Sequence, residues 1–175
     1  ENTYDLPHKI TVANETTNMM LLLAKEIKKA TNLPLGICVL WNDYKASLTI
    51  AKSIGAKFIR IPVFVDDVKT SYGNVNSCAK AAIKYRRLIG AENIAILTDI
   101  HVKHSVLISK KTLSQSAKLA KKEQSDGIII TGEWTGNLPK LSYLKEARAS
   151  VGNFPILVGS GATSKNVKKI FSLVS

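Results

Sequence analysis

Hydrophobic positions along the chain alternate between a spacing of about 3.6 residues and short, nearly continuous apolar runs. The first pattern is typical of a helix with one buried face, and the second of a buried strand. Helices are expected at about residues 15–30, 44–54, 76–89, 113–123, 142–151 and 164–173. Strands are expected at about residues 35–41, 57–65, 94–103, 127–131 and 155–158. Residues 66–74 form a long connection, which is typical of a lid or a binding loop.

A helix separates each expected strand from the next, so the strands are predicted to be parallel. A five-stranded doubly wound sheet would be complete at this length, whereas a (β/α)8 barrel needs about 250 residues and would be present only in part. Polar residues follow three of the strands, at residues 42–43, 99–104 and 131–136. This favours the barrel, in which many strand ends surround one site, although periodicity alone leaves both folds open.

The strand expected at residues 94–103 contains the strongest candidates for catalytic residues. One of its faces is apolar throughout, and the other presents Asp99, His101 and Lys103 towards its C-terminal end. Sites in parallel α/β proteins lie at this end of the strands. We therefore interpret Asp99, His101 and Lys103 as catalytic residues: Asp99 tunes His101 as a general base, and Lys103, or alternatively Arg60, holds an anion or an enolate. His104 is expected in the following loop, partly solvated.

Applying a period of two to every strand predicts a convergent polar set at the C-terminal ends. Its members are Asn42, Arg60, Asp99, His101, Lys103 and Thr131, with Asp43 and Gly132 beside them. Buried charges are costly unless they are paired, and this set exceeds what packing requires. The set therefore predicts a ligand site. The alternative is that Arg60 and Asp99 form an ion pair that only supports packing.

Gly159, Ser160 and Gly161 follow the last expected strand and precede the helix expected from Ser164. Glycines let backbone amides approach an anion, and a helix N-terminus adds partial positive charge. The sequence therefore predicts phosphate binding here, with a simple turn as the alternative. Asp99 and His101 are also a conceivable metal pair, but no third strong ligand is visible, so no metal site is assigned. No cofactor is assigned either.

Composition narrows the class of protein. The length of 175 residues, with 45% hydrophobic content, predicts one domain over residues 1–175 with a sizeable core. No apolar run approaches the ~20 residues of a membrane span, and no signal peptide opens the chain, so cytoplasm is the default location, with an organelle matrix conceivable. Cys38 and Cys78 are isolated, which suits a reducing compartment. The net charge of +12 comes from lysines scattered along helices rather than clustered with aromatic residues, so nucleic-acid binding is not expected.

Six segments, taken in order, resemble the BtpA/SgcQ family, which is named for a photosystem I biogenesis factor. They are LGICVLWND at 35–43, GAKFIR at 55–60, YRRLIGA at 85–91, TDIHVKH at 98–104, TGEWTG at 131–136 and VGSGAT at 158–163. The resemblance implies a (β/α)8 barrel of the ribulose-phosphate-binding type. It also implies that this chain supplies strands three to seven. Strands one and two would then precede Glu1, and strand eight would follow Ser175.

Two functions are expected from the residues and the resemblance together. The first is binding of, and action on, a small phosphorylated metabolite, such as a sugar phosphate or a nucleotide, at the C-terminal mouth of the barrel. The second is a non-enzymatic assembly or stability factor, which an exposed apolar patch on the outer helices would favour. In either case, strands 35–41 and 155–158 would be unpaired edges. Because exposed edges promote aggregation, a second copy or a further segment is expected to cover them.

Overall fold

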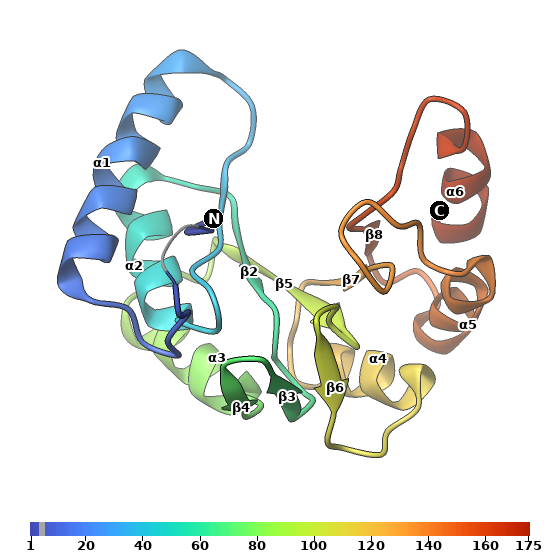
Figure 1. Cartoon of the computed structure of the whole chain (residues 1–175). Helices are drawn as coiled ribbons and strands as arrows, with labels where there is room; N and C mark the ends of the chain where they lie inside the picture. Colours follow the sequence, from blue (N-terminus) through green and yellow to red (C-terminus); the bar gives the residue numbers. More distant parts are fainter. Residues whose placement is uncertain (4–5) are drawn as a thin grey trace.

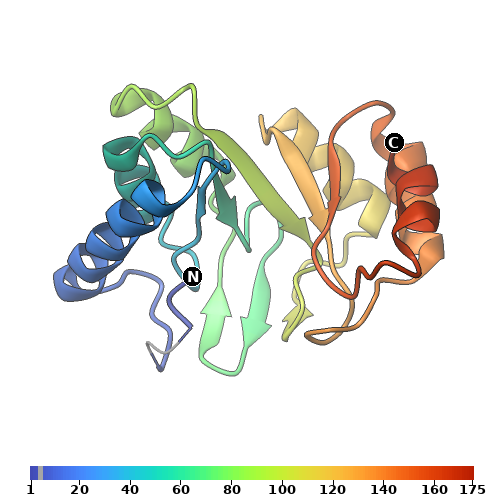
Figure 2. The same cartoon turned by 90° about the horizontal axis from the view of Figure 1, so that it is seen from above.

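The main sheet is curved and has its helices on the outside (Figure 1, Figure 2). The structure, a computed structural model, describes residues 1–3 and 6–175. In this part of the chain, five parallel strands lie in the order β1-β2-β5-β7-β8. Their bounds are β1 (Gly36–Ile37), β2 (Phe58–Ile61), β5 (Ala95–Ile100), β7 (Gly127–Ile130) and β8 (Ile156–Val158). This is the architecture of a partial (β/α)8 barrel, and the flat doubly wound alternative is wrong.

The helices of the described residues fall where the sequence predicts them. They are α1 (Asn14–Ala30), α2 (Tyr44–Ile54), α3 (Ala79–Leu88), α4 (Leu113–Lys122), α5 (Leu141–Val151) and α6 (Val167–Val174). α2 ends at Gly55, which adopts a left-handed conformation with φ 65°. α6 begins later than expected, at Val167 rather than Ser164. No helix in the described ranges is long and apolar enough to cross a bilayer.

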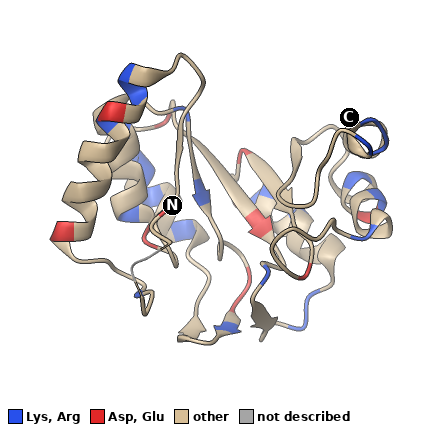
Figure 3. Ribbon diagram, turned by 45° about the horizontal axis from the view of Figure 1, so that its top comes forward, with Lys and Arg blue, Asp and Glu red and all other residues tan. Residues whose placement is uncertain are grey.

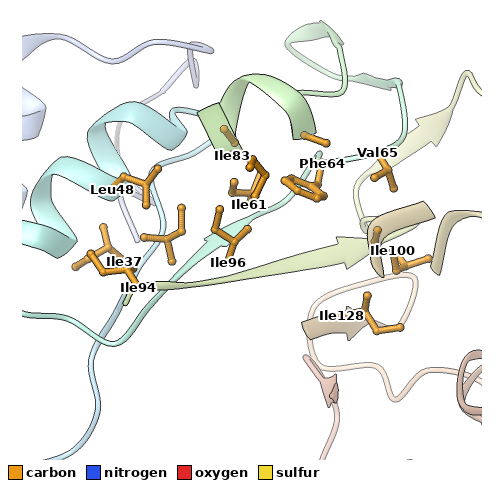
Figure 4. Packing of buried hydrophobic residues seen from close by; sticks show 14 of the residues in the cluster. Ile37, Leu48, Ile61, Phe64, Val65, Ile83, Ile94, Ile96, Ile100 and Ile128 are labelled. Atoms are coloured by element: carbon orange, nitrogen blue, oxygen red, sulfur yellow. The ribbon is translucent and has the colours of Figure 1, made fainter. Parts of the chain in front are cut away.

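The hydrophobic core lies between the convex face of the sheet and the helices (Figure 4). Ile96 and Ile100 of β5 are buried in this core. Because side chains alternate along a strand, Ala95, Leu97 and Asp99 lie on the concave face, as the period-two pattern predicts. The strand that carries the candidate chemistry is thus fixed by burial of its opposite face.

A second, antiparallel sheet was not predicted. It contains β4 (Gly73–Val75), β3 (Val68–Thr70) and β6 (Ser105–Leu107) in that order. The long connection expected at residues 66–74 therefore contains regular strands, and its residues 69–71 line the cleft described below. Each strand has only three residues, too few for periodicity to reveal. The small sheet joins the segment after β2 to the segment after β5, and so holds residues 101–104 in place.

The apolar face of α1 is only partly covered. Met20, Leu21 and Ala24 pack towards α2 and the core. Neighbouring elements in the described chain cover only this side of the helix. The exposed fractions are 57% for Met19, 59% for Leu22, 56% for Leu23 and 52% for Ile27.

Candidate functional site

The C-terminal ends of β5 and β7 open into a cleft of about 980 Å³. Its polar lining comes mainly from the β5–β6 turn, from the end of β7 and from β3. These residues include His101, Lys103, His104, Thr131, Gly132, Glu133, Trp134 and Lys69. A second cleft of about 450 Å³ adjoins it and shares Lys103 and His104. A cleft thus lies at the expected end of the sheet, and part of the predicted residue set lines it.

The turn from β5 to β6 has an unusual backbone. His101 has φ 52° and His104 has φ 60°. Left-handed conformations are uncommon for residues other than glycine, and they cluster at functional sites. Because β5 ends at Ile100, the alternation of side chains stops there, and His101 does not share the environment of Asp99.

Asp99 is held by Arg60. Arg60 Nε donates to Asp99 Oδ1 at 2.8 Å, and Nη2 donates to Oδ2 at 2.7 Å. Arg60 Nη1 also donates to Glu1 Oε1 at 2.7 Å. Burial raises the pKa of the Asp99 carboxyl, and the bonds from Arg60 oppose that rise. The predicted Asp99–His101 pair is therefore wrong, and the alternative ion pair between Arg60 and Asp99 is what forms.

His101 instead approaches a pair that the sequence analysis missed. Its Nε2 lies 3.4 Å from Ser116 Oγ, and Ser116 Oγ donates to Asp66 Oδ1 at 2.8 Å. Asp66 directly follows the apolar run of the second strand, a position that could have identified it. Ser116 is fully buried on α4, where a serine on an apolar stripe was the available signal.

His104 links the turn to the loop after β7. Its Nε2 lies 3.1 Å from Thr135 Oγ1, and its ring meets the Trp134 ring edge-on with centroids 5.2 Å apart. Trp134 is 63% exposed. His104 is exposed in the loop, as predicted.

The charge in the cleft is mainly positive. Lys103 makes no ion pair with any described residue, and Lys69 reaches the same cleft from β3. Glu133 is the acidic residue that lines the cleft. Its Oε1 lies 3.5 Å from Lys140 Nζ. Elsewhere, Lys and Arg are spread over both groups of helices rather than gathered in one patch (Figure 3).

Asn42 and Asp43 are engaged outside the cleft. Asn42 Nδ2 donates to Val63 O at 2.7 Å, and Asn42 Oδ1 accepts from Val63 N at 3.0 Å. Asp43 caps α2 by accepting from Ala46 N at 2.9 Å, and it also accepts from Val12 N at 3.0 Å. Both side chains are buried. The structure therefore separates these two predicted ligand-binding residues from the cleft.

Ser160 and Gly161 pack against the loop that follows β7, and Gly159 N donates to Ile130 O at the end of β7 at 3.0 Å. Ser160 Oγ accepts from Gly136 N at 3.1 Å. Gly161 has φ 67°, and a Cβ there would lie 2.3 Å from the backbone nitrogen of Leu138. None of the three lines the cleft, and α6 does not begin directly after them. The need for glycine here is explained by the close approach of two loops.

No group of three or more His, Cys, Asp or Glu side chains gathers within the described residues. The conceivable metal pair of Asp99 and His101 does not form, because both oxygens of Asp99 bind Arg60.

Comparison with known sequences gives a consistent family match. A sequence model of the BtpA family matches residues 1–175. An uncharacterised protein from Pyrococcus furiosus is 36% identical over 172 residues, which cover 98% of this chain and 64% of that protein. The photosystem I biogenesis protein BtpA of Synechocystis is 33% identical over 172 residues, with 97% and 60% covered. An uncharacterised mitochondrial protein of Caenorhabditis elegans is 33% identical, with 97% and 64% covered. The chain thus spans less than two thirds of the length of these relatives.

Solved structures agree on the fold. FabK from Thermotoga maritima superposes with a TM-score of 0.62 at 11% identity, over 91% of this chain and 44% of FabK. N-(5'-phosphoribosyl)anthranilate isomerase from Pyrococcus furiosus superposes with a TM-score of 0.54 at 14% identity, over 88% of this chain and 65% of the isomerase. Both are TIM-barrel enzymes. At these identities the likeness shows the fold alone, which is that of a partial barrel.

Proposed function

This chain belongs to the BtpA family, and from that we propose that it binds a small phosphorylated metabolite, a sugar phosphate or a nucleotide, in the cleft at the ends of β5 and β7. We assign residues 1–175 to one barrel domain and its parallel strands to positions three to seven. The observation that carries the proposal is the gathering of Lys69, Lys103 and two imidazoles in that cleft.

Lys103 is the residue that we assign to the anion. It lies where the two clefts meet, and it forms no ion pair with a carboxylate of the described chain. A lysine ammonium binds phosphate as a point charge. Arg60 is less suited, because Asp99 and Glu1 already occupy its guanidinium. We assign Arg60, Asp99, Asn42 and Asp43 to holding the wall of the site.

Thr131 and Gly132 complete the opposite wall at the end of β7. The Thr131 hydroxyl is buried and has no hydrogen-bond partner among the described residues. Buried hydroxyls nearly always have a partner, so an orphan at the cleft wall supports a ligand or a bound water there. Gly159 to Gly161 support the site by positioning the loop after β7. One structural neighbour is named for a phosphoribosyl substrate, in line with this class of ligand.

His101 is the residue that we assign to proton transfer. It lines the cleft, and its left-handed backbone (φ 52°) is a cost that a purely structural turn would avoid with glycine or asparagine. An imidazole beside a bound sugar phosphate can remove a proton next to a carbonyl group. The nearby Lys103 ammonium would stabilise the enolate that forms.

Binding is tested by calorimetry with ribose 5-phosphate and, as its matched probe, ribose. We expect ribose 5-phosphate to bind and ribose to bind much more weakly. Lys103→Met should weaken ribose 5-phosphate binding about tenfold or more, since charge-assisted bonds contribute about 1.5–3 kcal/mol. Lys84→Met, on the outer helix α3, removes the same charge away from the cleft and is the control. Equal affinities for the two probes, or equal losses in the two variants, would refute the proposal.

Proton transfer is tested by exchange of carbon-bound hydrogen of ribulose 5-phosphate with D2O, followed by NMR. His101→Asn is the suitable variant, because asparagine tolerates the left-handed conformation. We expect it to abolish exchange and to change the dissociation constant little, because a base acts chiefly in the transition state. Exchange that persists in His101→Asn would show that His101 is not the base.

The assembly-factor function is a second candidate because of the exposed α1 face, which is defined by Met19, Leu22, Leu23 and Ile27. In this case, a partner protein covers that face. Complementation of a host that lacks its own family member separates the two functions. Lys103→Met should fail to complement under the metabolite proposal. Leu23→Glu should fail, and Lys103→Met succeed, under the assembly proposal. We also expect a second copy or a further segment to cover the edge strands β1 and β8.

A further inference from the structure

We propose that Ser116 and Asp66 are positioning residues that hold His101 as its Nε2–H tautomer and leave Nδ1 as the nitrogen that accepts a proton from the ligand. The inference rests on the proposed function, which assigns proton transfer to His101. It adds two residues to the site and names the reactive atom.

The direction of the hydrogen bonds decides the tautomer. A carboxylate only accepts hydrogen bonds, and a serine hydroxyl has one proton to donate. Ser116 Oγ donates that proton to Asp66 Oδ1 at 2.8 Å. Only its lone pairs then remain for His101 Nε2, which lies 3.4 Å away. Nε2 must therefore carry the hydrogen, and the neutral ring has its free lone pair on Nδ1.

Asp66 is well fixed as the acceptor. Its Oδ1 also accepts from Ser109 Oγ at 3.1 Å and from Lys111 Nζ at 3.3 Å. The side chain is 6% exposed. Three donors, from Ser116, Ser109 and Lys111, thus converge on this one oxygen. In this arrangement the Ser116 hydroxyl proton points to Asp66 Oδ1 rather than to the imidazole.

Rigid elements hold the pair in place. Ser116 lies in the first turns of α4 and its backbone nitrogen donates to Thr112 O at 3.0 Å. Thr112 and Gln115 form a reciprocal capping box at the start of that helix. Asp66 lies next to Asp67, whose carbonyl accepts from Ile108 N at 2.8 Å. Ser116 thus comes from α4, Asp66 from the segment after β2 and His101 from the β5–β6 turn. We call these three residues the relay, and each is held in place by its own element.

The other ring nitrogen faces the ligand side. His101 lines the large cleft, and within the described residues its only hydrogen-bond contact is the one at Nε2. The Nδ1 atom is not among the buried polar atoms that lack a partner, so it is accessible to solvent on a residue that lines the cleft. Bonds of this kind are often long before a ligand binds and shorten in the complex.

The tautomer is read by NMR of the ring nitrogens in protein with 15N-labelled histidine. Signals of His101 are identified by their loss in His101→Asn. In the parent protein at neutral or higher pH, we expect a proton on Nε2 with a resolved N–H resonance and an unprotonated Nδ1. Ser116→Ala should lose that resonance to exchange with water and shift Nδ1 towards the average of two tautomers. Ser114→Ala, on the same helix and bonded to Ser150 rather than to the relay, should match the parent.

Two results would overturn the inference: a proton on Nδ1 in the parent, or an unchanged tautomer in Ser116→Ala. The position of the proton in the parent protein is measured without any variant. The inference can therefore be refuted even if Ser116→Ala does not fold. The measurement also needs no ligand. If the tautomer is as expected but ribose 5-phosphate does not bind, the proposed function is refuted. The role of Ser116 and Asp66 in fixing the His101 tautomer is then still supported. If both hold, Ser116→Ala should slow exchange of ribulose 5-phosphate while leaving its dissociation constant unchanged.

Discussion

The Arg60 guanidinium binds both carboxylate oxygens of Asp99, with Nε–Oδ1 at 2.8 Å and Nη2–Oδ2 at 2.7 Å. The pair joins β2 to β5 on the concave face of the sheet. The Asp99 side chain is fully buried, while that of Arg60 is 23% exposed. Loss of the guanidinium would leave a buried carboxylate without its partner, which is far more costly than loss of a surface pair.

The first prediction follows from this asymmetry. Arg60→Met should lower the free energy of unfolding by about 3–5 kcal/mol, measured by urea denaturation. Adding Asp99→Leu should recover much of that loss, because no unpaired charge remains. The control is Glu26→Ala, which breaks the Glu26–Lys29 pair on the surface of α1 and should change stability by less than about 0.5 kcal/mol. Similar losses in Arg60→Met and Glu26→Ala would contradict the argument.

Much of the fold could be predicted from sequence. The segment at residues 44–54 has helical periodicity between Asp43 and Gly55, and both act as caps. The strand around Ile96 has a continuous apolar face, so its inward and outward sides could be assigned. These features succeed because burial and capping are local and recur over many residues. The small sheet failed for the opposite reason, since three-residue strands carry no period.

The site was harder to predict because polar partners come from distant parts of the chain. Asp99 and His101 are two residues apart, yet they bind Arg60 and Ser116 respectively. The positive φ of His101 ends the alternation of side chains along β5. No sequence pattern predicts this backbone conformation. Asp66 reaches Ser116 across 50 residues. Sequence therefore indicated the strand end at which the cleft lies, and only the tertiary structure assigned the partners.

A second prediction concerns the loop at Gly161. Gly161→Ala should reduce stability more than Gly55→Ala, although both glycines have positive φ. The Gly55 Cβ would meet nothing within 4 Å, so only the left-handed backbone costs about 1–2 kcal/mol. The Gly161 Cβ would lie 2.3 Å from Leu138 N and 2.6 Å from Asn137 C, so the two loops must separate. Thermal unfolding and limited proteolysis of the loop after β7 measure both effects, and equal losses would show that the loops do not touch.

A third prediction concerns the buried amide of Asn42. Asn42→Asp should destabilise the protein by about 2–4 kcal/mol, because a carboxylate cannot donate to Val63 O and must be buried as well. Asn42→Leu should also destabilise the protein, because Val63 N loses its acceptor and Val63 O keeps only the bond from Cys78 Sγ at 3.3 Å. Asn74→Asp, at an exposed position in the small sheet, is the control and should be close to neutral. Ribose 5-phosphate affinity in the folded fraction of Asn42→Asp should match the parent, since Asn42 does not line the cleft; a specific loss of affinity would return Asn42 to the ligand site.

The last prediction concerns alkaline pH and Cys38. Burial raises the pKa of the Cys38 thiol from 9.0 to about 12, with Glu1 adding to the rise and Arg60 opposing it. Between those two values the unfolded chain has lost the thiol proton and the folded chain keeps it. The free energy of unfolding should therefore fall as pH rises above about 9, by up to about 1.4 kcal/mol per pH unit from this group, and should not depend on it below that pH.

Urea denaturation of the parent and of Cys38→Ala, at neutral pH and at about pH 10, measures the effect. Cys38→Ala should be less stable at neutral pH because it leaves a small cavity, yet its stability should fall less on going to the higher pH. The folded parent should also react slowly with iodoacetamide at Cys38 near neutral pH, because the thiolate is the nucleophile, and it should react rapidly once urea unfolds it. An equal fall in stability for both proteins would mean that Cys38 ionises as easily in the folded chain as in the unfolded one.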